Sequence, residues 1–269
     1  MIEESKLEVR VGELLDVLYT KRFASLEALT LTKLINKNPY LYRAIGINDP
    51  SVFIDQLLSA RISSSDETIF GNDFLEPLAL WSAKESDQHE GGDRSVTVGA
   101  GAGQDIAIET ATAYLAISVK SGKNIFNSQS NKGQSTEFDE LQSRLKKLNK
   151  QFRPIIGYGY GRKLNKKETT TEKVAGQMFW ELLTGEPDYY LRIARAIGKY
   201  AESHGEAYKK EFATKKLQLL RAFMLNYVTE DGQMLWDAVV TFNSSKDRPK
   251  RLKTPKVEKL DDEVQLFDL

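Results

Sequence analysis

The chain has 269 residues, of which 41% are hydrophobic and 28% are charged, and its 38 basic and 38 acidic side chains give a net charge of zero. A chain of this length can bury one substantial core with a helical part added to it. It has no cysteine and two histidines, which excludes disulfides, thiolate zinc sites, cysteine nucleophiles and clusters of histidine ligands. Any bound metal is therefore expected to have oxygen ligands, as Mg²⁺ does.

The hydropathy pattern gives no sign of a membrane protein. No apolar run approaches the roughly 20 residues of a membrane-spanning helix. The first ten residues, MIEESKLEVR, are charged and unlike a secretory signal. We therefore expect a cytoplasmic protein with no membrane contact.

Helices are expected first along the chain. Residues 1–62 show helical spacing of apolar residues, and Pro39 and Pro50 each follow a residue type, asparagine and aspartate, that caps helix starts. A further helix is expected over residues 64–85. The polar, glycine-rich stretch that follows is expected to be a loop with one short strand at residues 95–98.

Two strands with a tight connection are predicted within residues 103–124, GQDIAIETATAYLAISVKSGKN. Side chains alternate between the two faces of a strand, so one face holds the buried apolar set and the other, polar face carries Asp105. With the turn near residues 110–112, Asp105 pairs with Ser118 on this second face, and Lys120 lies just beyond. A carboxylate facing a lysine on adjoining strands is typical of a nuclease site that holds a metal beside a phosphate. A solvated surface hairpin would show the same alternation.

The segment after the hairpin is rich in amide side chains. Residues 124–134, NIFNSQSNKGQ, are interpreted as a loop that either reads base edges and phosphates or serves as a linker. A helix is expected from about 136 to 151, begun by a capping box of Thr136 and Asp139. A glycine-rich strand follows near residue 157, and its spacing does not fit a nucleotide-binding loop.

The last third of the chain has a helical pattern. Helices are expected from residue 173 onward, first in KVAGQMFWELL and then in two longer segments that meet near Gly205. The tail after residue 243 is basic and then acidic, and we expect it to be loosely ordered.

Positive charge is grouped along the chain although the net charge is zero. Basic clusters occur at residues 120–123, 144–153, 161–167 and 246–256. Each cluster alone is common on a solvated face, but three of them flank the hairpin in sequence, which is typical of a DNA-binding cleft.

The hairpin resembles the D...(D/E)xK signature of the PD-(D/E)XK nuclease superfamily. Asp105 matches the first acid, and SVK, ending in Lys120, matches the second half with Ser118 in place of the second acid. Over most of the chain the resemblance is to type II restriction endonucleases. The segments that carry it are NPYLYRA (38–44), ETIFGNDFLE (67–76), ISVKSGKN (117–124), GYGYGRK (157–163) and GQMFWELLTGE (176–186).

This resemblance implies an α/β fold: a PD-(D/E)XK-type core with a mixed central β-sheet flanked by helices, and N- and C-terminal helical regions. The expected divisions are an N-terminal helical region (1–62), a catalytic core (63–172), a C-terminal helical region packed on the core (173–243) and a charged tail (244–269). The implied chemistry is Mg²⁺-dependent hydrolysis of DNA.

The resemblance also assigns roles to individual residues. Asp105 and Glu76, with the main-chain carbonyl of Val119, are the expected magnesium ligands, although Glu76 could also be an ordinary exposed helix acid. Lys120 is expected to orient or deprotonate the attacking water, and Ser118 completes the catalytic set. The expected DNA contacts are Lys123, Asn124, Asn127, Lys132 and Arg162.

The expected partner is double-stranded DNA, bound by a homodimer because a duplex presents two strands of opposite polarity. A cognate DNA methyltransferase would act on the same site. Two alternatives remain open at this stage: a nuclease of the same superfamily that acts on branched or damaged DNA, and a DNA-binding protein without catalysis.

Overall fold

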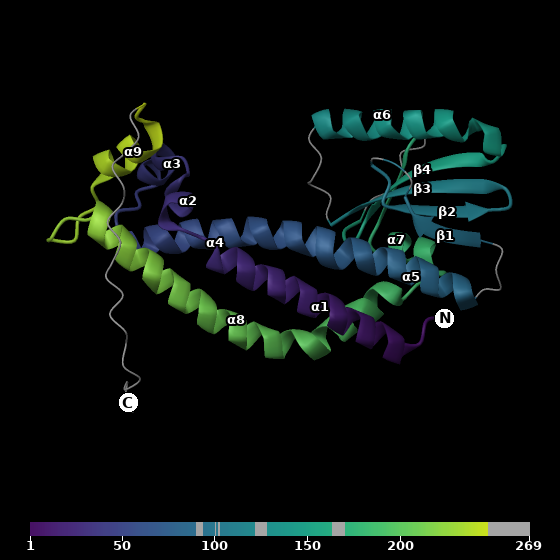
Figure 1. Cartoon of the computed structure of the whole chain (residues 1–269), viewed down its shortest axis with the longest axis horizontal. Helices are drawn as coiled ribbons and strands as arrows, with labels where there is room; N and C mark the ends of the chain where they lie inside the picture. Colours follow the sequence, from purple (N-terminus) through teal and green to yellow (C-terminus); the bar gives the residue numbers. More distant parts are fainter. Residues whose placement is uncertain (90–93, 100, 102, 122–127, 163–169, 247–269) are drawn as a thin grey trace. The chain divides into compact units, whose positions relative to one another are not determined.

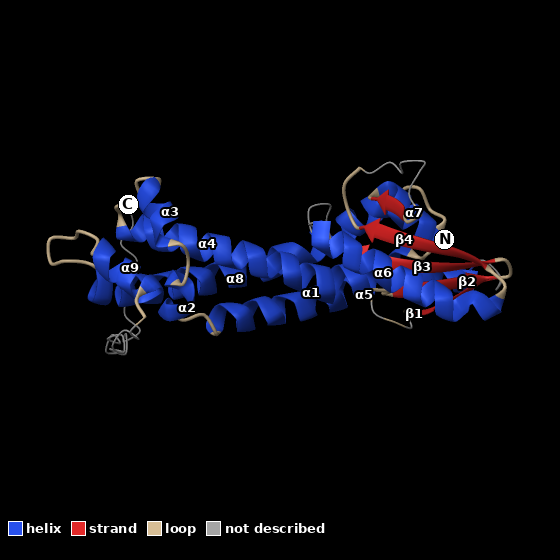
Figure 2. Ribbon diagram, turned by 90° about the horizontal axis from the view of Figure 1, so that it is seen from above, coloured by secondary structure: helices blue, strands red, loops and turns tan. Residues whose placement is uncertain are grey.

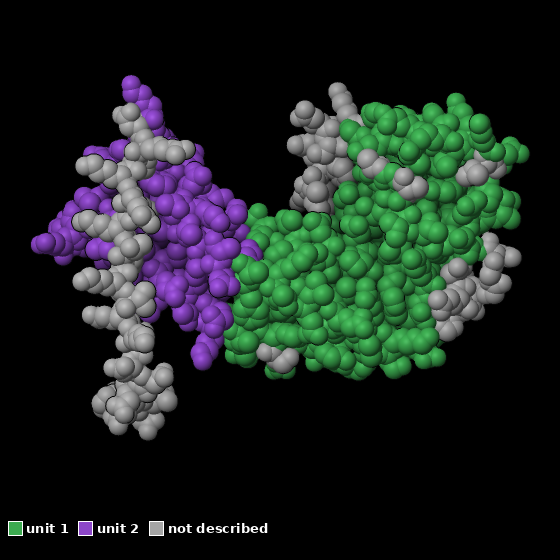
Figure 3. Space-filling model, viewed as in Figure 1, with its two compact units in different colours: residues 1–24, 64–208 green, residues 25–63, 209–269 purple. Residues whose placement is uncertain are grey.

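The computed structural model describes residues 1–89, 94–99, 101, 103–121, 128–162 and 170–246. It divides into two compact units (Figure 3): unit 1 comprises residues 1–24 and 64–208, and unit 2 comprises residues 25–63 and 209–269. Within the described ranges, no helix combines the length and the apolar character needed to cross a bilayer.

Helices precede and follow a group of five strands (Figure 1). In chain order the elements are α1 (Glu4–Glu27), α2 (Leu31–Ile35), α3 (Pro39–Ala44), α4 (Pro50–Ile69), the π-helix η1 (Phe70–Leu75), α5 (Glu76–His89), β1 (Arg94–Val98), β2 (Ile106–Thr110), β3 (Ala113–Lys120), α6 (Ser128–Leu145), the 3₁₀ helix η2 (Lys146–Leu148), β4 (Gln151–Tyr158), β5 (Glu172–Ala175), α7 (Gln177–Thr184), α8 (Tyr189–Tyr227) and α9 (Trp236–Ser244).

The five strands form one mixed sheet in unit 1, in the order β1-β2-β3-β4-β5 (Figure 2). The first three strands pair antiparallel, whereas β3, β4 and β5 pair in parallel, and α6 makes the crossover from β3 to β4. The α/β class with a mixed sheet, flanking helices and helical regions at both ends is therefore confirmed. The short strand expected at residues 95–98 is β1.

The β2–β3 hairpin has the register that the sequence predicts. Ile106 pairs with Ile117, and the N–H of Asp105 donates to the Ile117 carbonyl at 2.9 Å, so Asp105 lies opposite Ser118. At the turn, the N–H of Ala113 donates to the Thr110 hydroxyl at 3.0 Å.

The hairpin is not the solvated surface hairpin that the same alternation would also allow. Helix α6 covers the face that carries Asp105 (Figure 1), where the small side chains of Ala107 and Ala116 leave room for Phe138 and Leu141. Both faces of β3 are consequently buried along its middle, and polar groups remain accessible only at the end of the strand. The alanines on this face therefore indicate the surface on which a helix packs.

The expected start of the α6 helix is also wrong. The helix begins at Ser128, and Thr136 lies in its interior, so Thr136 is not its N-cap. The polar residues that suggested a loop are tolerated because a helix on the surface of a sheet needs only one apolar stripe. Gln134, Phe138 and Leu141 lie on this stripe, and all three are buried.

The opposite face of the sheet lies against α5 and α7 (Figure 1). Two glycines of the glycine-rich strand make this packing possible: a Cβ on Gly157 would lie 2.2 Å from the Phe179 ring, and a Cβ on Gly159 would lie 2.6 Å from Leu75. Residues 173–175, expected to start a helix, instead form part of β5. The helix α7 begins only after Gly176, whose φ of 57° interrupts the chain direction.

Unit 2 is helical, and both of its predicted helix starts are confirmed. The Asn38 side chain accepts hydrogen bonds from the first turn of α3, and the Asp49 carboxylate accepts the Val52 N–H at 2.8 Å. Its core holds Phe53, whose ring lies 5.3 Å from Phe223 and 5.6 Å from Trp236.

The two long C-terminal helices expected from the sequence are one helix. Helix α8 runs for 39 residues without a break at Gly205. A single glycine inside a helix costs only about 1 kcal/mol relative to alanine, which the apolar contacts along such a long helix readily offset.

Candidate active site

Asp105 lies at the end of the sheet where β2 begins. Its Oδ2 atom accepts the Val119 N–H at 2.6 Å, and the Ser118 hydroxyl lies 3.4 Å from the same oxygen. The Lys120 Nζ atom is 3.9 Å from Oδ2. Three consecutive residues of β3 therefore surround one carboxylate oxygen. No described residue hydrogen-bonds the second oxygen, Oδ1, which is left for a further ligand.

Ser118 lies beside Asp105, on the buried side of the carboxylate. Its side chain is completely buried, and its hydroxyl lies closer to the Gln134 Oε1 atom (3.1 Å) than to Asp105. A hydroxyl has one proton to donate, so the shorter contact takes it. Gln134 in turn donates to the Gly103 carbonyl at 2.8 Å, just before Asp105. Ser118 and Gln134 thus tie α6 to the segment that carries Asp105.

Lys120 is the last residue of β3, and its side chain is 25% exposed. The N–H of Gly159, just after β4, donates to its carbonyl at 2.9 Å and fixes the end of the strand. The π-helix η1 contacts the same end of β3, since a Cβ on Gly71 would touch the Ser121 side chain at 3.5 Å.

Glu76 enters the same site from η1, as the first residue of α5. Its side chain is partly buried. Burial raises the pKa of its carboxyl group, the nearby charges of Asp105 and Asp73 raise it further, and Lys120 lowers it. These mutual effects put Glu76 within electrostatic range of both Asp105 and Lys120. Among the acids and the lysine selected from the sequence, Asp105 and Lys120 lie 3.9 Å apart, and Glu76 lies within electrostatic range of both.

The direction of the Val119 carbonyl follows from the strand geometry. The N–H and C=O of one strand residue point to the same side, and those of successive residues alternate. The Val119 N–H points to Asp105, while the Lys120 carbonyl points to β4. The Val119 carbonyl therefore points toward Asp105.

These oxygens set limits on a metal site. Within the described part of the chain, no group of three histidine, cysteine, aspartate or glutamate side chains lies close enough to hold a metal. A cation here would draw on two carboxylates, one main-chain carbonyl and water. Mg²⁺ commonly binds through one or two carboxylates and keeps several waters, so the donor set fits this ion.

Two contributors were missed in the sequence. Gln134 was assigned to a loop, although it lies four residues before Phe138 and seven before Leu141, a spacing that signals one helix face. Asp73 of η1 raises the pKa of Glu76 and is itself paired with Lys21, whose Nζ atom is 2.6 Å away. No local pattern indicated this pair.

The structure describes only some of the predicted DNA contacts. Lys123, Asn124 and Asn127 lie outside the described residues, and Lys132 lies in α6 with its side chain outside the description. Arg162 is exposed and lines a cavity of about 790 Å³ beyond the end of β4. Aromatic and apolar side chains form most of this cavity, among them Phe74, Tyr160, Met178 and Trp180.

Comparison with protein-family models matches residues 5–205 to the model described as Type II restriction endonuclease EcoO109I. Comparison with curated proteins gives no match. The matched residues include both units in part and every group of the candidate site. This match covers most of the 269 residues, and the resemblance to type II restriction endonucleases is thereby confirmed: the chain belongs to the family of the type II restriction endonuclease EcoO109I.

Proposed function

We propose that this chain cuts double-stranded DNA at a specific sequence by Mg²⁺-dependent hydrolysis, with a catalytic core of the PD-(D/E)XK type. The observation that carries the proposal is the Asp105–Lys120 pair at the end of β3, whose atoms lie 3.9 Å apart. Glu76 lies within electrostatic range of both and supports it. Phosphodiester hydrolysis needs a cation to neutralise the phosphate and a positioned water to attack it, and these groups supply both requirements.

Asp105 and Glu76 would hold the magnesium ion, with the Val119 carbonyl as a third protein ligand. The hydrogen bond from Val119 occupies Oδ2 of Asp105 and turns Oδ1 toward the ligand. The raised pKa of Glu76 fits this role, because two carboxylates that share a site repel each other until a cation neutralises them. When bound, the ion supplies Lewis acidity at the phosphoryl oxygen.

Lys120 would act on the attacking water. Its ammonium group donates to the oxygen of that water, orients it toward phosphorus, and stabilises the negative charge that grows on the phosphoryl oxygens. The water oxygen forms a bond to phosphorus and releases a proton to solvent, one P–O ester bond breaks, and the leaving oxygen takes up a proton from solvent. Ser118 donates to Gln134, which binds the Gly103 carbonyl just before Asp105, and Ser118 does not touch the substrate.

DNA binding would extend from this end of the sheet. We assign phosphate and base contacts to Lys123, Asn124, Asn127, Lys132 and Arg162. A two-fold dimer would cut both strands of a symmetric sequence, and a methyltransferase of the same specificity would protect the host DNA. Binding should weaken as salt rises, because phosphate contacts release counterions.

The test is digestion of a bacteriophage genome of known sequence with the full chain. With Mg²⁺ we expect discrete fragments whose ends share one sequence, and with excess chelator we expect intact DNA. A branched four-way junction is digested in parallel. Cleavage of the junction alone would replace the restriction assignment with a structure-specific nuclease, and binding without any Mg²⁺-dependent cut would leave a DNA-binding protein without catalysis.

A further inference from the structure

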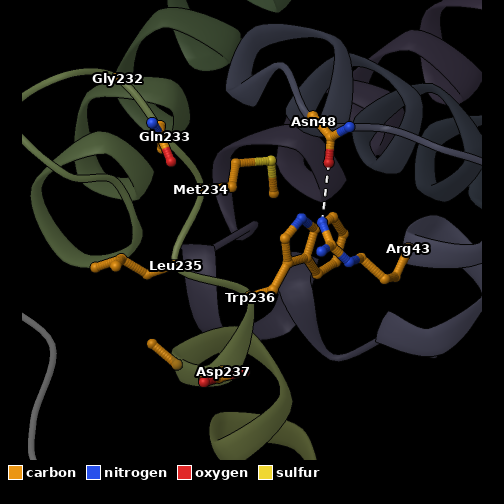
Figure 4. A pocket seen from close by; sticks show the side chains of 9 residues that line it. Arg43, Asn48, Gly232, Gln233, Met234, Leu235, Trp236 and Asp237 are labelled. Carbon is orange, nitrogen blue, oxygen red and sulfur yellow. Dashed lines mark hydrogen bonds between the residues drawn. The ribbon is translucent and has the colours of Figure 1, made fainter.

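Unit 2 contains a cavity that takes no part in the candidate active site. It has a volume of about 720 Å³ and lies between the end of α3, the turn that follows α8, and the start of α9 (Figure 4). Its lining includes Arg43, Asn48, Gln233, Met234, Trp236 and Asp237. All of these belong to unit 2.

Arg43 brings an unneutralised positive charge to this cavity. Its guanidinium group lies over the Trp236 ring, 5.5 Å from the centroid, and donates one hydrogen bond to the Asn48 side chain at 3.0 Å. Asn48 is neutral, and no acid among the described residues forms an ion pair with Arg43. A guanidinium has five N–H donors in a fixed fork, so most of them remain for a ligand.

Trp236 adds a buried donor without an acceptor. The residue is 9% exposed, and its indole N–H is shielded from water and makes no hydrogen bond. Leaving a buried donor unsatisfied costs about 1–3 kcal/mol. Figure 4 shows the Trp236 indole close to the guanidinium of Arg43, which a dashed line joins to the Asn48 side chain.

The start of α9 provides a third positive feature. No side chain caps this helix, and the N–H of Asp237 in its first turn has no acceptor among the described residues. Free N–H groups and the helix dipole favour an anion at this position. The Asp237 carboxylate repels an anion here, so removing its charge should strengthen anion binding.

We infer that this cavity binds a phosphate group. Arg43 would hold two phosphate oxygens through its fork, a third oxygen would accept the indole N–H of Trp236, and the start of α9 would contribute its free N–H. The indole N–H is shielded from water in the free chain, so binding requires the side chains that cover it to move. The phosphate has two possible sources, the backbone of DNA and a free phosphate ester. The inference does not depend on the proposed function.

The test follows the indole N–H signals of the three tryptophans by NMR while inorganic phosphate is added to the full chain. The Trp236→Phe variant removes and so identifies one signal. We expect that signal to shift with phosphate and to stay in place with sodium chloride at equal ionic strength. An unmoved Trp236 signal at high phosphate concentration would overturn the inference.

Three variants give the binding a directional signature. Arg43→Gln should weaken phosphate binding by about tenfold or more, because the charged guanidinium makes the strongest of the proposed hydrogen bonds to phosphate. Asp237→Asn should strengthen binding about threefold by removing the opposing charge. Arg61→Gln, at an exposed position of α4 in the same unit, is the matched control and should change nothing. Equal losses in Arg43→Gln and Arg61→Gln would contradict the assigned site.

A short DNA duplex added in chelator then identifies the source of the phosphate. Displacement of inorganic phosphate by the duplex assigns the cavity to the DNA backbone, and persistence of the phosphate-shifted signal assigns it to free phosphate esters. Chelator prevents cleavage, so this outcome is read separately from catalysis. Failure of the cavity to bind phosphate would leave the proposed nuclease activity untouched.

Discussion

The β2–β3 hairpin has a carboxylate and a lysine at each of its ends, and the two pairs differ in geometry. At the turn end, the Lys150 Nζ atom lies 2.7 Å from the Glu109 carboxylate and 2.6 Å from the Thr110 carbonyl. At the other end, the Lys120 Nζ atom remains 3.9 Å from Asp105, whose nearer oxygen already accepts a main-chain N–H.

This difference separates an ion pair that stabilises the fold from one that is free to act on a third group. Lys150 satisfies its charge with two close acceptors and fastens the start of β4 to the turn. Lys120 and Asp105 do not satisfy each other. The partly buried carboxylate of Glu76, nearby, has no hydrogen bond or ion pair with any residue that the structure describes. A carboxylate and a lysine therefore serve structure at one end and, in our proposal, chemistry at the other.

The largest difference between the two pairs is expected when the charge of each acid is removed. Asp105→Asn should reduce the DNA cleavage rate by about 10³-fold, because it removes a metal ligand worth several kcal/mol in the transition state. Glu109→Gln should leave cleavage within about twofold, since the turn-end acid is too distant to share the metal. Initial rates on a plasmid substrate measure both. Comparable losses in the two variants would contradict the division of roles.

The two lysines form the next test. Lys120→Met keeps the aliphatic stem and removes the ammonium, and should lower cleavage by about 10²–10³-fold while DNA binding persists. Lys150→Met should leave the rate unchanged and cost at most about 1 kcal/mol of stability, as for other partly exposed ion pairs. Gel-shift affinity measured in chelator, beside cleavage rates, distinguishes the two effects. A Lys120→Met enzyme that cuts at the wild-type rate would remove Lys120 from the mechanism.

The sequence predicted the hairpin pair well because its geometry is local. Period-two alternation and a short turn are sufficient to place Asp105 opposite Ser118. The same alternation does not tell whether the alanines meet solvent or a helix, because that depends on a crossover that periodicity does not encode.

Glu76 is the opposite case. Its segment resembles a family pattern, but its orientation depends on the π-helix η1. A π-helix has more residues per turn than an α-helix, so the 3.6-residue period that runs through α4 does not predict which way Glu76 faces. The pair of Asp73 with Lys21 joins segments 52 residues apart, and no spacing rule reaches that far.

Gln134 extends the comparison to the residues that hold Asp105 in place. Gln134→Ala removes the link between the Ser118 hydroxyl and the Gly103 carbonyl, and should lower activity by about 10–100-fold, the usual effect of losing a partner behind a metal ligand. Gln142→Ala, on the exposed side of the same helix, is the matched control. The deficit should shrink at high Mg²⁺ concentration if Gln134 acts by positioning Asp105. A deficit that does not respond to Mg²⁺ would contradict that role.

The smallest expected effect is on stability and follows from the raised pKa of Glu76. An acid whose pKa is higher in the folded than in the unfolded chain holds its proton more tightly when folded, so stability falls as pH rises from about the ordinary value of 4.5 through the raised pKa. At neutral pH the metal-free fold therefore bears the full cost of an ionised Glu76. Glu76→Gln removes this cost and should raise the melting temperature in chelator at pH 7 by on the order of 1–3 °C, with the difference disappearing toward pH 4.

Added Mg²⁺ should reverse the order of the two proteins. A ligand that binds only the folded state stabilises it by mass action, so the wild-type melting temperature should rise with Mg²⁺ while that of Glu76→Gln should rise less. Turn-end variants such as Glu109→Gln should respond to Mg²⁺ as the wild type does. If Glu76→Gln melts below the wild type in chelator at pH 7, then ionised Glu76 stabilises the fold, as Glu109 does at the other end of the hairpin. Glu76 would then not be a destabilising charge that a bound cation compensates.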